Sequence, residues 1–281
     1  MYNIRKMEAI INDKKLNDDE LQKEIKKVLT YKSKGNEMSF VGNNILYHFQ
    51  MEELCNTKRK GKDTLVEIFN DPIKLEKLKE CVAKRNRTGT MENKMFECWR
   101  INNGSITFFK MCNAVYLYKK YNAKKVLDPT AGWGGRMLGA INLGIEYTGI
   151  DTNTNLTAGY DKMIDLFDCG SKCKMIYNSF LNVDFSTIDY DFVLTSPPYE
   201  DIEIYSHFNY NDKERFYREF LIPLIDKSRE HNKGIFTCIN ISPEMYKKLT
   251  SVYNYKVCDI IEDLKEQKNG KVCDNIYIWI N

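Results

Sequence analysis

The feature that most limits how this chain can fold is a strand that runs directly into a glycine-rich turn and then into a helix. Val126 and Leu127 are apolar strand residues, residues 129–135 contain three glycines, and residues 137–141 have a helical apolar pattern. A second strand, residues 146–151, ends in Asp151. Glycines let the backbone pass close to a ligand, and an acid at this position suits hydrogen bonds to ribose hydroxyls. The pattern predicts an α/β fold that binds a ribose-containing ligand.

A second motif, Ser196-Pro197-Pro198-Tyr199, follows the apolar residues 192–194. Two successive prolines cannot continue a sheet, so the strand must end there, at the edge where open α/β sheets bind ligands. The residue before each proline is held extended, which gives the Ser196 side chain and the Pro197 carbonyl a nearly fixed arrangement. A planar base stacked on Tyr199 would place its exocyclic amine near these two oxygen acceptors.

This arrangement suits methylation of an aromatic amine, which is a poor nucleophile because its lone pair is delocalised into the ring. Oxygen acceptors for its hydrogens favour a more tetrahedral nitrogen that can attack. Each motif alone has another interpretation: a Pro-Pro turn can simply end a buried strand, and dinucleotide enzymes share the glycine-rich layout. The turn lacks Gly-x-Gly-x-x-Gly spacing, however, and a nicotinamide enzyme has no use for the second motif.

Together, residues 128–135 and the tetrad resemble the S-adenosylmethionine-dependent DNA methyltransferases that modify exocyclic amines, at N6 of adenine or N4 of cytosine. The resemblance covers most of residues 104–281. It implies S-adenosyl-L-methionine as cofactor and an α/β fold with a Rossmann-like methyltransferase sheet, mostly parallel with an antiparallel last strand. The catalytic residues that it implies are Ser196, Pro197, Pro198 and Tyr199.

The same resemblance implies a set of cofactor contacts. The glycine-rich loop would pass under the methionine part of the cofactor, and Asp151 would hold the ribose. Asn178 follows the third strand, where the family more often shows Asp against the adenine, and Phe109 belongs to the candidate for the remaining cofactor motif, residues 104–110. The full implied set is Asp128, Ala131, Gly132, Gly134, Asp151, Asn178 and Phe109.

The identity of the target base is indicated by the first tetrad position. Serine there favours N4 of cytosine, because N6-adenine enzymes more often carry Asp or Asn. Beyond the tetrad, Tyr205 and Phe208 are candidates to receive a flipped base, although residues 200–208 could equally form an exposed acidic loop. Arg136 could contact the cofactor carboxylate or a phosphate, or lie on a helix surface.

Charge divides the chain into a basic and an acidic part. Through Lys125 there are 26 Lys and Arg against 16 Asp and Glu, a net of +10; the remainder has 16 against 23, a net of −7. Such cations supply sequence-independent affinity for a polyanion, although a lysine-rich solvated surface would show the same pattern. We expect DNA, or alternatively RNA, to be bound through two basic clusters, which contain Lys58, Arg59, Lys60, Lys84, Arg85 and Arg87.

Little chain remains after Tyr199 for a separate recognition domain. We expect a helix over residues 212–230, a strand over 234–239, a helix opened by Ser242 and Pro243, and strands near 255–262 and 275–280. Residues 1–95 are predicted to form a small, mostly helical domain, and residues 96–281 the methyltransferase domain. In the first of these, helices are expected at 16–29 and from Asp71-Pro72 onward, whereas residues 40–49 show no clear period.

Cysteine usage and hydropathy point to an intracellular protein. The nine cysteines are scattered through predicted helices and strands, as expected of reduced thiols, and Cys169 and Cys173 are interpreted as structural. The three histidines are far apart, so no metal site is predicted. No signal peptide or membrane span is expected either.

Two other functions remain open at this level. A tetrad of this kind also serves RNA and protein-glutamine methyltransferases, whose planar nitrogen presents the same electronic problem. The chain could alternatively be a non-catalytic nucleic-acid-binding subunit, although a silent copy has no reason to keep both motifs. A partner protein or an oligomer is compatible with either.

Overall fold

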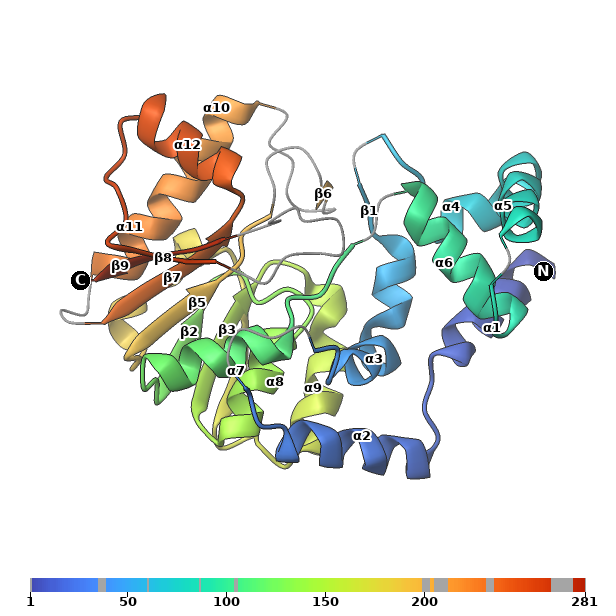
Figure 1. The fold of residues 1–281 in the computed structure, drawn as a ribbon, viewed down its shortest axis with the longest axis horizontal. Coiled ribbons are helices and arrows are strands. Elements are labelled where there is room, and N and C mark those ends of the chain that lie inside the picture. Colours follow the sequence, from blue (N-terminus) through green and yellow to red (C-terminus); the bar gives the residue numbers. More distant parts are fainter. Residues whose placement is uncertain are drawn as a thin grey trace.

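The computed structural model describes residues 2–34, 39–59, 61–85, 87–103, 106–198, 203–204, 212–230, 235–263 and 275–280. Its centre is a seven-stranded sheet with the strand order β4-β3-β2-β5-β7-β9-β8 (Figure 1). The strands are β2 (Lys125–Asp128), β3 (Glu146–Asp151), β4 (Cys173–Tyr177), β5 (Phe192–Thr195), β7 (Phe236–Ile241), β8 (Ile260–Asp263) and β9 (Asn275–Ile280).

The direction of the strands confirms the expected fold class. Strands β4, β3, β2, β5 and β7 pair in parallel, and β9 is antiparallel to both of its neighbours, β7 and β8. This is a mostly parallel, Rossmann-like sheet with an antiparallel last strand. The chain leaves β2 toward β3 on one side, and later returns to the other side of β2 as β5. Ligands bind at such a reversal point, beyond the carboxyl ends of the strands.

Helices cover both faces of this sheet. Neighbouring strand residues alternate between two buried clusters: Val126 belongs to one and Leu127 to the other, and Phe192 and Val193 divide in the same way. On the first face lie α7 (Met111–Lys120), α8 (Gly135–Leu143) and α9 (Thr157–Leu166); on the second lie α10 (Lys213–Phe216), α11 (Ile222–Glu230) and α12 (Pro243–Ser251) (Figure 1). Short 3₁₀ turns are η1 (Thr154–Leu156), η2 (Phe180–Asn182) and η3 (Phe185–Thr187).

The expected elements after the tetrad are present. The helix predicted over residues 212–230 is one helical run, but a π-helical turn, η4 (Tyr217–Leu221), separates α10 from α11. Ser242 caps α12 through the Met245 N–H, with proline at the first helical position as expected. The last predicted strands correspond to β8, which begins later than expected, and to β9.

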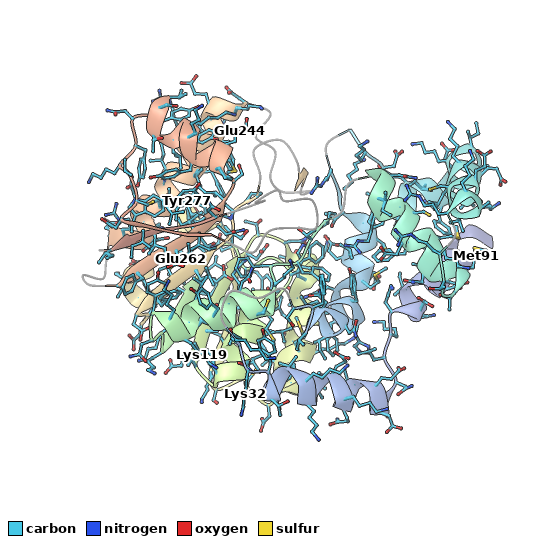
Figure 2. All side chains as sticks on the ribbon, in the orientation of Figure 1. Lys32, Met91, Lys119, Glu244, Glu262 and Tyr277 are labelled. Atoms are coloured by element: carbon cyan, nitrogen blue, oxygen red, sulfur yellow. The ribbon has the colours of Figure 1, made fainter. Side chains whose placement is uncertain are left out.

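The N-terminal third is helical and consists of two groups. Helix α2 packs on α8 and helix α3 on α9, whereas α1, α4, α5 and α6 contact one another at the right of Figure 1. Met91 in α6 and Tyr277 in β9 mark opposite ends of the molecule (Figure 2). The helices are α1 (Tyr2–Asp13), α2 (Asp18–Thr30), α3 (Asn43–Asn56), α4 (Leu65–Asn70), α5 (Pro72–Lys84) and α6 (Met91–Asn103).

Helix α3 is the element that sequence periodicity does not reveal. Its buried residues Ile45, Leu46, Met51 and Leu54 do not form a single stripe, because α3 lies between α9 on one side and α4 on another. A helix that is buried on several sides lacks the one-sided pattern that periodicity detects. One buried cluster therefore continues from Ile10 through α3 into the sheet. The division near residue 95 stays a prediction, but α2 and α3 of the N-terminal third pack on helices that cover the sheet.

A short ribbon connects the N-terminal third to the segment beyond the tetrad. Strand β1 (Lys58–Arg59) pairs antiparallel with β6 (Glu203–Ile204), with Lys58 opposite Ile204 and Arg59 opposite Glu203. The first basic cluster thus lies next to the chain that follows the tetrad. Within the described residues, no helix is both long and apolar enough to cross a membrane.

Candidate functional site

One cleft at the carboxyl ends of the central strands contains residues from both sequence motifs. It encloses about 660 Å³ of space that opens to solvent. Asp151 and Gly132 line it on the side of β3 and β2, and Ser196 and Pro198 line it beyond β5. Its full lining is Pro129, Thr130, Gly132, Trp133, Asp151, Thr152, Leu156, Asn178, Ser179, Phe180, Ser196, Pro198 and Phe220.

Asp151 lies at the end of β3, where each carboxylate oxygen already accepts one backbone hydrogen bond. Oδ2 accepts the Gly132 N–H at 2.7 Å and Oδ1 accepts the Asn153 N–H at 2.8 Å. Burial raises the pKa of the Asp151 carboxyl to about 6, although these two N–H groups oppose the shift. Since each oxygen can accept more than one hydrogen bond, the carboxylate keeps acceptor sites for two ribose hydroxyls.

The glycine-rich turn takes a conformation that favours glycine. Gly132 and Gly134 have φ of +60° and +99°, in the left-handed region. Gly132 lines the cleft and donates to Asp151, as a contact residue should. A Cβ on Gly134 would lie 3.1 Å from the Met163 side chain and 3.4 Å from that of Leu46. Gly134 therefore lets α9 and α3 approach the turn and does not line the cleft.

Asp128 is fully buried and lies behind the cleft. Its Oδ2 accepts from Arg136 Nε at 2.6 Å and from the Tyr147 hydroxyl at 2.7 Å, whereas Oδ1 has no partner among the described residues. Burial alone would lower the pKa of the Arg136 guanidinium, but the Asp128 charge raises it above its usual value. Arg136 also donates to the Thr130 carbonyl. Arg136 thus holds the first turn through a buried ion pair, and neither role considered from the sequence describes it.

Two further residues of the expected cofactor set also lie behind the lining. Ala131 is buried and its N–H donates to the Ile150 carbonyl at 2.9 Å. Phe109 is partly buried, and its ring centre is 5.0 Å from the Arg136 guanidinium carbon. Its carbonyl oxygen lies so close to Gly135 that a side chain there would clash, since a Cβ would be only 1.9 Å away. These residues pack against the turn, and their direct contact with a cofactor stays a prediction.

The opposite end of the cleft offers an amide between apolar side chains. Asn178 lines it directly after β4, and its Oδ1 accepts the Ser179 N–H at 2.8 Å. Leu156 and Phe180 are buried lining residues, and the Phe220 ring meets that of Phe180 edge-on at 5.0 Å. A planar heterocycle needs apolar surface for its faces and polar groups at its edge, and both are present here.

The loop that begins the Ser-Pro-Pro-Tyr tetrad contacts the glycine-rich turn through two side chains. The hydroxyls of Thr195, at the end of β5, and Thr130 lie 2.6 Å apart and share a hydrogen bond. Ser196 then lines the cleft, and its Oγ accepts a hydrogen bond from Asn240 Nδ2 at 3.1 Å. Pro197 continues the loop and Pro198 lines the cleft, while Tyr199 lies outside the described residues.

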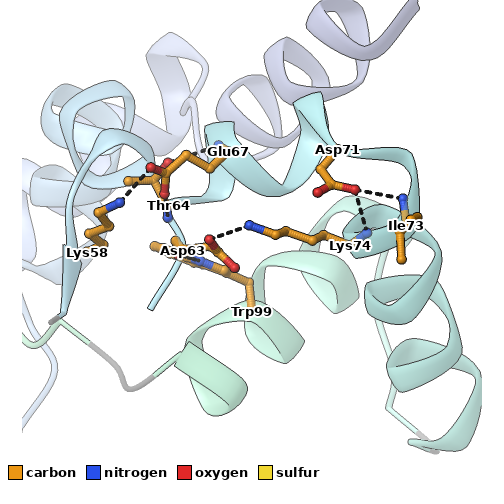
Figure 3. A network of polar contacts seen from close by, with 8 residues as sticks. All are labelled: Lys58, Asp63, Thr64, Glu67, Asp71, Ile73, Lys74 and Trp99. Atoms are coloured by element: carbon orange, nitrogen blue, oxygen red, sulfur yellow. Dashed lines mark hydrogen bonds and ion pairs between the residues drawn. The ribbon is translucent and has the colours of Figure 1, made fainter. Parts of the chain in front are cut away.

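The described cations of the two basic clusters lie on the outer helices and the β1 ribbon. Lys58 in β1 is paired with Glu67 at 2.5 Å, as Figure 3 shows. Lys84 ends α5 within 3.9 Å of Glu80, and Arg87 is exposed. Arg59 and Arg85 are partly buried. Lys60, Tyr205 and Phe208 lie outside the described residues, so their expected contacts stay predictions.

Several lining residues were not predicted from the sequence. Trp133 lies inside the glycine-rich turn, and its position next to Gly132 could have indicated it. Phe180 and Leu156 follow the ends of β4 and β3, where such contacts are expected in this fold. Phe220 comes from the π-helical turn, a local distortion that is frequent at functional sites but has no sequence signature here.

The residues of this cleft fit S-adenosylmethionine. A carboxylate with spare acceptor sites, a glycine that lines the cleft with positive φ, and apolar side chains beside an amide match a ribose, a methionine chain and an adenine respectively. The described residues contain no group of three or more His, Cys, Asp and Glu side chains that could hold a metal ion.

Comparison of the chain with protein-family models and with curated proteins gives no match. Similar solved structures include an RNA methyltransferase from Salinibacter ruber in complex with S-adenosyl-L-homocysteine, at 13% identity over 62% of this chain and 92% of that chain (TM-score 0.41). Trm5 from Methanocaldococcus jannaschii in complex with adenosine is 17% identical over 62% of this chain and 50% of that chain (TM-score 0.42). The human methyltransferase 10 domain containing protein is 13% identical over 60% and 81% respectively (TM-score 0.44). Similarity at this level carries no argument about substrate, which must come from the site itself.

Proposed function

We propose that this protein transfers a methyl group from S-adenosylmethionine to the exocyclic amine of a flipped DNA base, at N4 of cytosine or N6 of adenine. The observation that supports this most is the single cleft that joins Asp151 to Ser196 and Pro198. A cofactor site and a Ser-Pro-Pro-Tyr loop in one cavity would allow a donor methyl and an acceptor amine to meet. Neither motif alone carries that argument.

Different residues along the cleft would bind different parts of the cofactor. Asp151 would accept the two ribose hydroxyls, and Gly132 lets the backbone approach the methionine chain. Asn178, Leu156 and Phe180 would surround the adenine. When bound, the cofactor supplies an electrophilic methyl group on a sulfonium sulfur.

At the other end of the cleft, the loop would orient the acceptor amine. The Ser196 hydroxyl and the Pro197 carbonyl would each accept a hydrogen bond from one N–H of the amine. These two bonds direct the nitrogen lone pair out of the ring plane. Tyr199 would stack on the base and hold it at the cleft. The transfer would leave the cofactor as the thioether S-adenosylhomocysteine, and the methylated nitrogen would then lose one proton to solvent. Because no residue needs to remove a proton before attack, this is catalysis by orientation and electrostatics. Serine at this position favours cytosine over adenine as the target.

DNA would reach this cleft across the basic N-terminal third. The chain through Lys125, which includes this third, has a net charge of +10, against −7 for the remainder. The β1–β6 ribbon connects Lys58 and Arg59 to the chain that follows the catalytic loop. Phosphates held by these side chains would therefore lie near the cleft, and binding should weaken with salt.

The test is a transfer assay with labelled S-adenosylmethionine and, in separate reactions, mixed-sequence duplex DNA, RNA and protein. After digestion, mass spectrometry identifies the modified nucleoside or amino acid. N4-methylcytosine or N6-methyladenine from DNA is the expected product. Label only in RNA or in glutamine would overturn DNA as substrate, and the absence of cofactor binding by calorimetry would favour a non-catalytic subunit.

Tyr199→Ala tests the stacking role in the same assay. Loss of the stacking ring should reduce turnover roughly 100-fold, because a base that is misplaced by about 1 Å reacts far more slowly. The affinity for S-adenosylmethionine should change less than twofold, since the ring is assigned to the target base. Unchanged turnover would remove Tyr199 from the mechanism.

A further inference from the structure

Asn240 is a buried polar residue that the motifs do not explain. It lies in β7, between Ile239 and Ile241, and only 5% of its surface is exposed. Asparagine is disfavoured in strands and costs stability when buried without full hydrogen bonding. Yet its Oδ1 has no hydrogen-bond partner among the described residues. A buried amide that is only half satisfied calls for a reason other than stability.

The register of the sheet places Asn240 beside the first residue of the tetrad. Strands β5 and β7 are parallel, with Thr195 opposite Ile239, so the next residues along the two chains are Ser196 and Asn240. Asn240 Nδ2 donates to Ser196 Oγ at 3.1 Å. The contact therefore comes from the central strands, which are the most rigid support this fold has for a side chain at the cleft.

That contact determines how Ser196 can meet a substrate. A serine hydroxyl has one hydrogen to donate and two lone pairs to accept with, and alone it rotates among three staggered positions. A donor fixed at one lone pair excludes the hydroxyl hydrogen from that position, so the hydrogen and the second lone pair share two positions instead of three at the cleft that Ser196 lines. An oxygen that must accept an amine hydrogen during attack gains from this restriction before the substrate arrives.

We propose that Asn240 is a positioning residue for methyl transfer: it holds the Ser196 hydroxyl with a lone pair directed at the target amine. This inference rests on the proposed function, since it concerns the same acceptor. Asn240 acts through Ser196 and is itself not a catalytic residue.

The first variant is Asn240→Leu, which keeps the approximate volume and removes the donor. We expect kcat to fall roughly 10- to 100-fold, the range for a misoriented reacting group, while the Kd for S-adenosylmethionine stays within twofold. Thr237→Val is the matched control, because Thr237 is a fully buried polar residue at the other end of the same strand. It should leave kcat unchanged, and circular dichroism checks the fold of both variants.

The second variant, Asn240→Asp, separates positioning from a structural role. A protonated carboxyl group can still donate to Ser196 Oγ, whereas the carboxylate cannot. Activity of this variant should therefore be largest at low pH and fall as pH rises through the pKa of the introduced carboxyl, relative to the wild-type profile. A residue that serves only the packing of β7 would not create this additional pH limb in kcat.

The outcomes are distinguishable. If the wild type methylates no nucleic acid or protein, the proposed function fails and this inference with it. If the wild type is active but Asn240→Leu retains its kcat, only the inference about Asn240 is overturned. A third outcome combines two results: Asn240→Leu loses both cofactor binding and kcat, and the pH profile of kcat for Asn240→Asp is parallel to that of the wild type. These results would assign Asn240 a structural role, which also overturns the inference.

Discussion

The ion pair behind the cleft and three ion pairs of the N-terminal third lie in different surroundings. The side chains of Arg136, in the first turn of α8, and Asp128, at the end of β2, are 4% and 0% exposed. In the N-terminal third, the pairs Lys58–Glu67, Lys74–Asp63 and Lys79–Glu76 have side chains that are 31% to 62% exposed. Figure 3 shows the first two of these pairs around the capped start of α5.

The difference in burial indicates that the ion pairs of the two regions have different roles. A buried pair cannot be solvated by water, so removing one partner leaves a charge at high cost, and the pair specifies one arrangement of the turn. Exposed pairs contribute little to stability and can exchange partners when a polyanion approaches. The buried pair therefore holds the glycine-rich turn in shape, and these exposed pairs of the N-terminal third keep charge available for binding.

The largest effect should follow from breaking the buried pair. Arg136→Met leaves the Asp128 carboxylate without a cation and should lower the free energy of unfolding by about 3–5 kcal/mol. Lys74→Met, the matched exposed change, should lower it far less. Urea unfolding at neutral pH measures both. Equal losses in the two variants would contradict the contrast between the regions, and adding Asp128→Asn to Arg136→Met should recover part of the stability.

The next largest effect concerns the carboxylate that faces the cleft. Asp151→Ala removes both acceptors for the ribose hydroxyls and should weaken binding of S-adenosylmethionine roughly 100-fold, since each charge-assisted hydrogen bond is worth about 1.5–3 kcal/mol. Isothermal titration calorimetry measures the affinity. Asp161→Ala, an exposed acid on α9, serves as control and should bind normally. Unchanged affinity in Asp151→Ala would remove the ribose assignment.

A smaller effect should follow from removing exposed cations. Replacing Lys84 and Arg87 with alanine should weaken duplex DNA binding about tenfold near 0.1 M salt, with a log–log salt slope shallower by about 2. Fluorescence anisotropy at several salt concentrations gives both quantities. The control pair is Lys172 and Lys174, which lie by a polar pocket at the other edge of the sheet. If both pairs weaken binding equally, the N-terminal third is not the DNA surface.

The smallest effect is a pH dependence of cofactor binding. The pKa of Asp151 is raised by burial to about 6, and only the carboxylate can accept two ribose hydroxyls. As pH falls through 6 the group takes up a proton that binding must release, so affinity should be about fourfold weaker at pH 5.5 than at pH 7.5. Calorimetry across this range tests it. Affinity that is constant down to pH 5 would contradict a raised pKa for a ribose-binding Asp151.

Local motifs made much of the fold and part of the site predictable. The strand–turn–helix at residues 125–141, the acid at Asp151 and the proline stop after β5 each depend on residues adjacent in sequence, and each is present. Helix α3 was missed because it is buried on several sides and has no single apolar stripe. Asp128 and Gly134 were expected at the cofactor, but whether such residues face a cleft or a helix depends on packing.

By itself the sequence determined which strands are followed by candidate functional residues. The glycine-rich turn, Asp151 and the proline-terminated loop are each recognised from a few adjacent residues. Tertiary structure decided which of these strand ends lie together. It joined Asp151 and Ser196 in one cleft, placed Asn240 beside Ser196 through strand register, and paired β1 with β6. These relations link residues distant in the chain, and they arise only when the sheet forms and its helices bury their apolar faces.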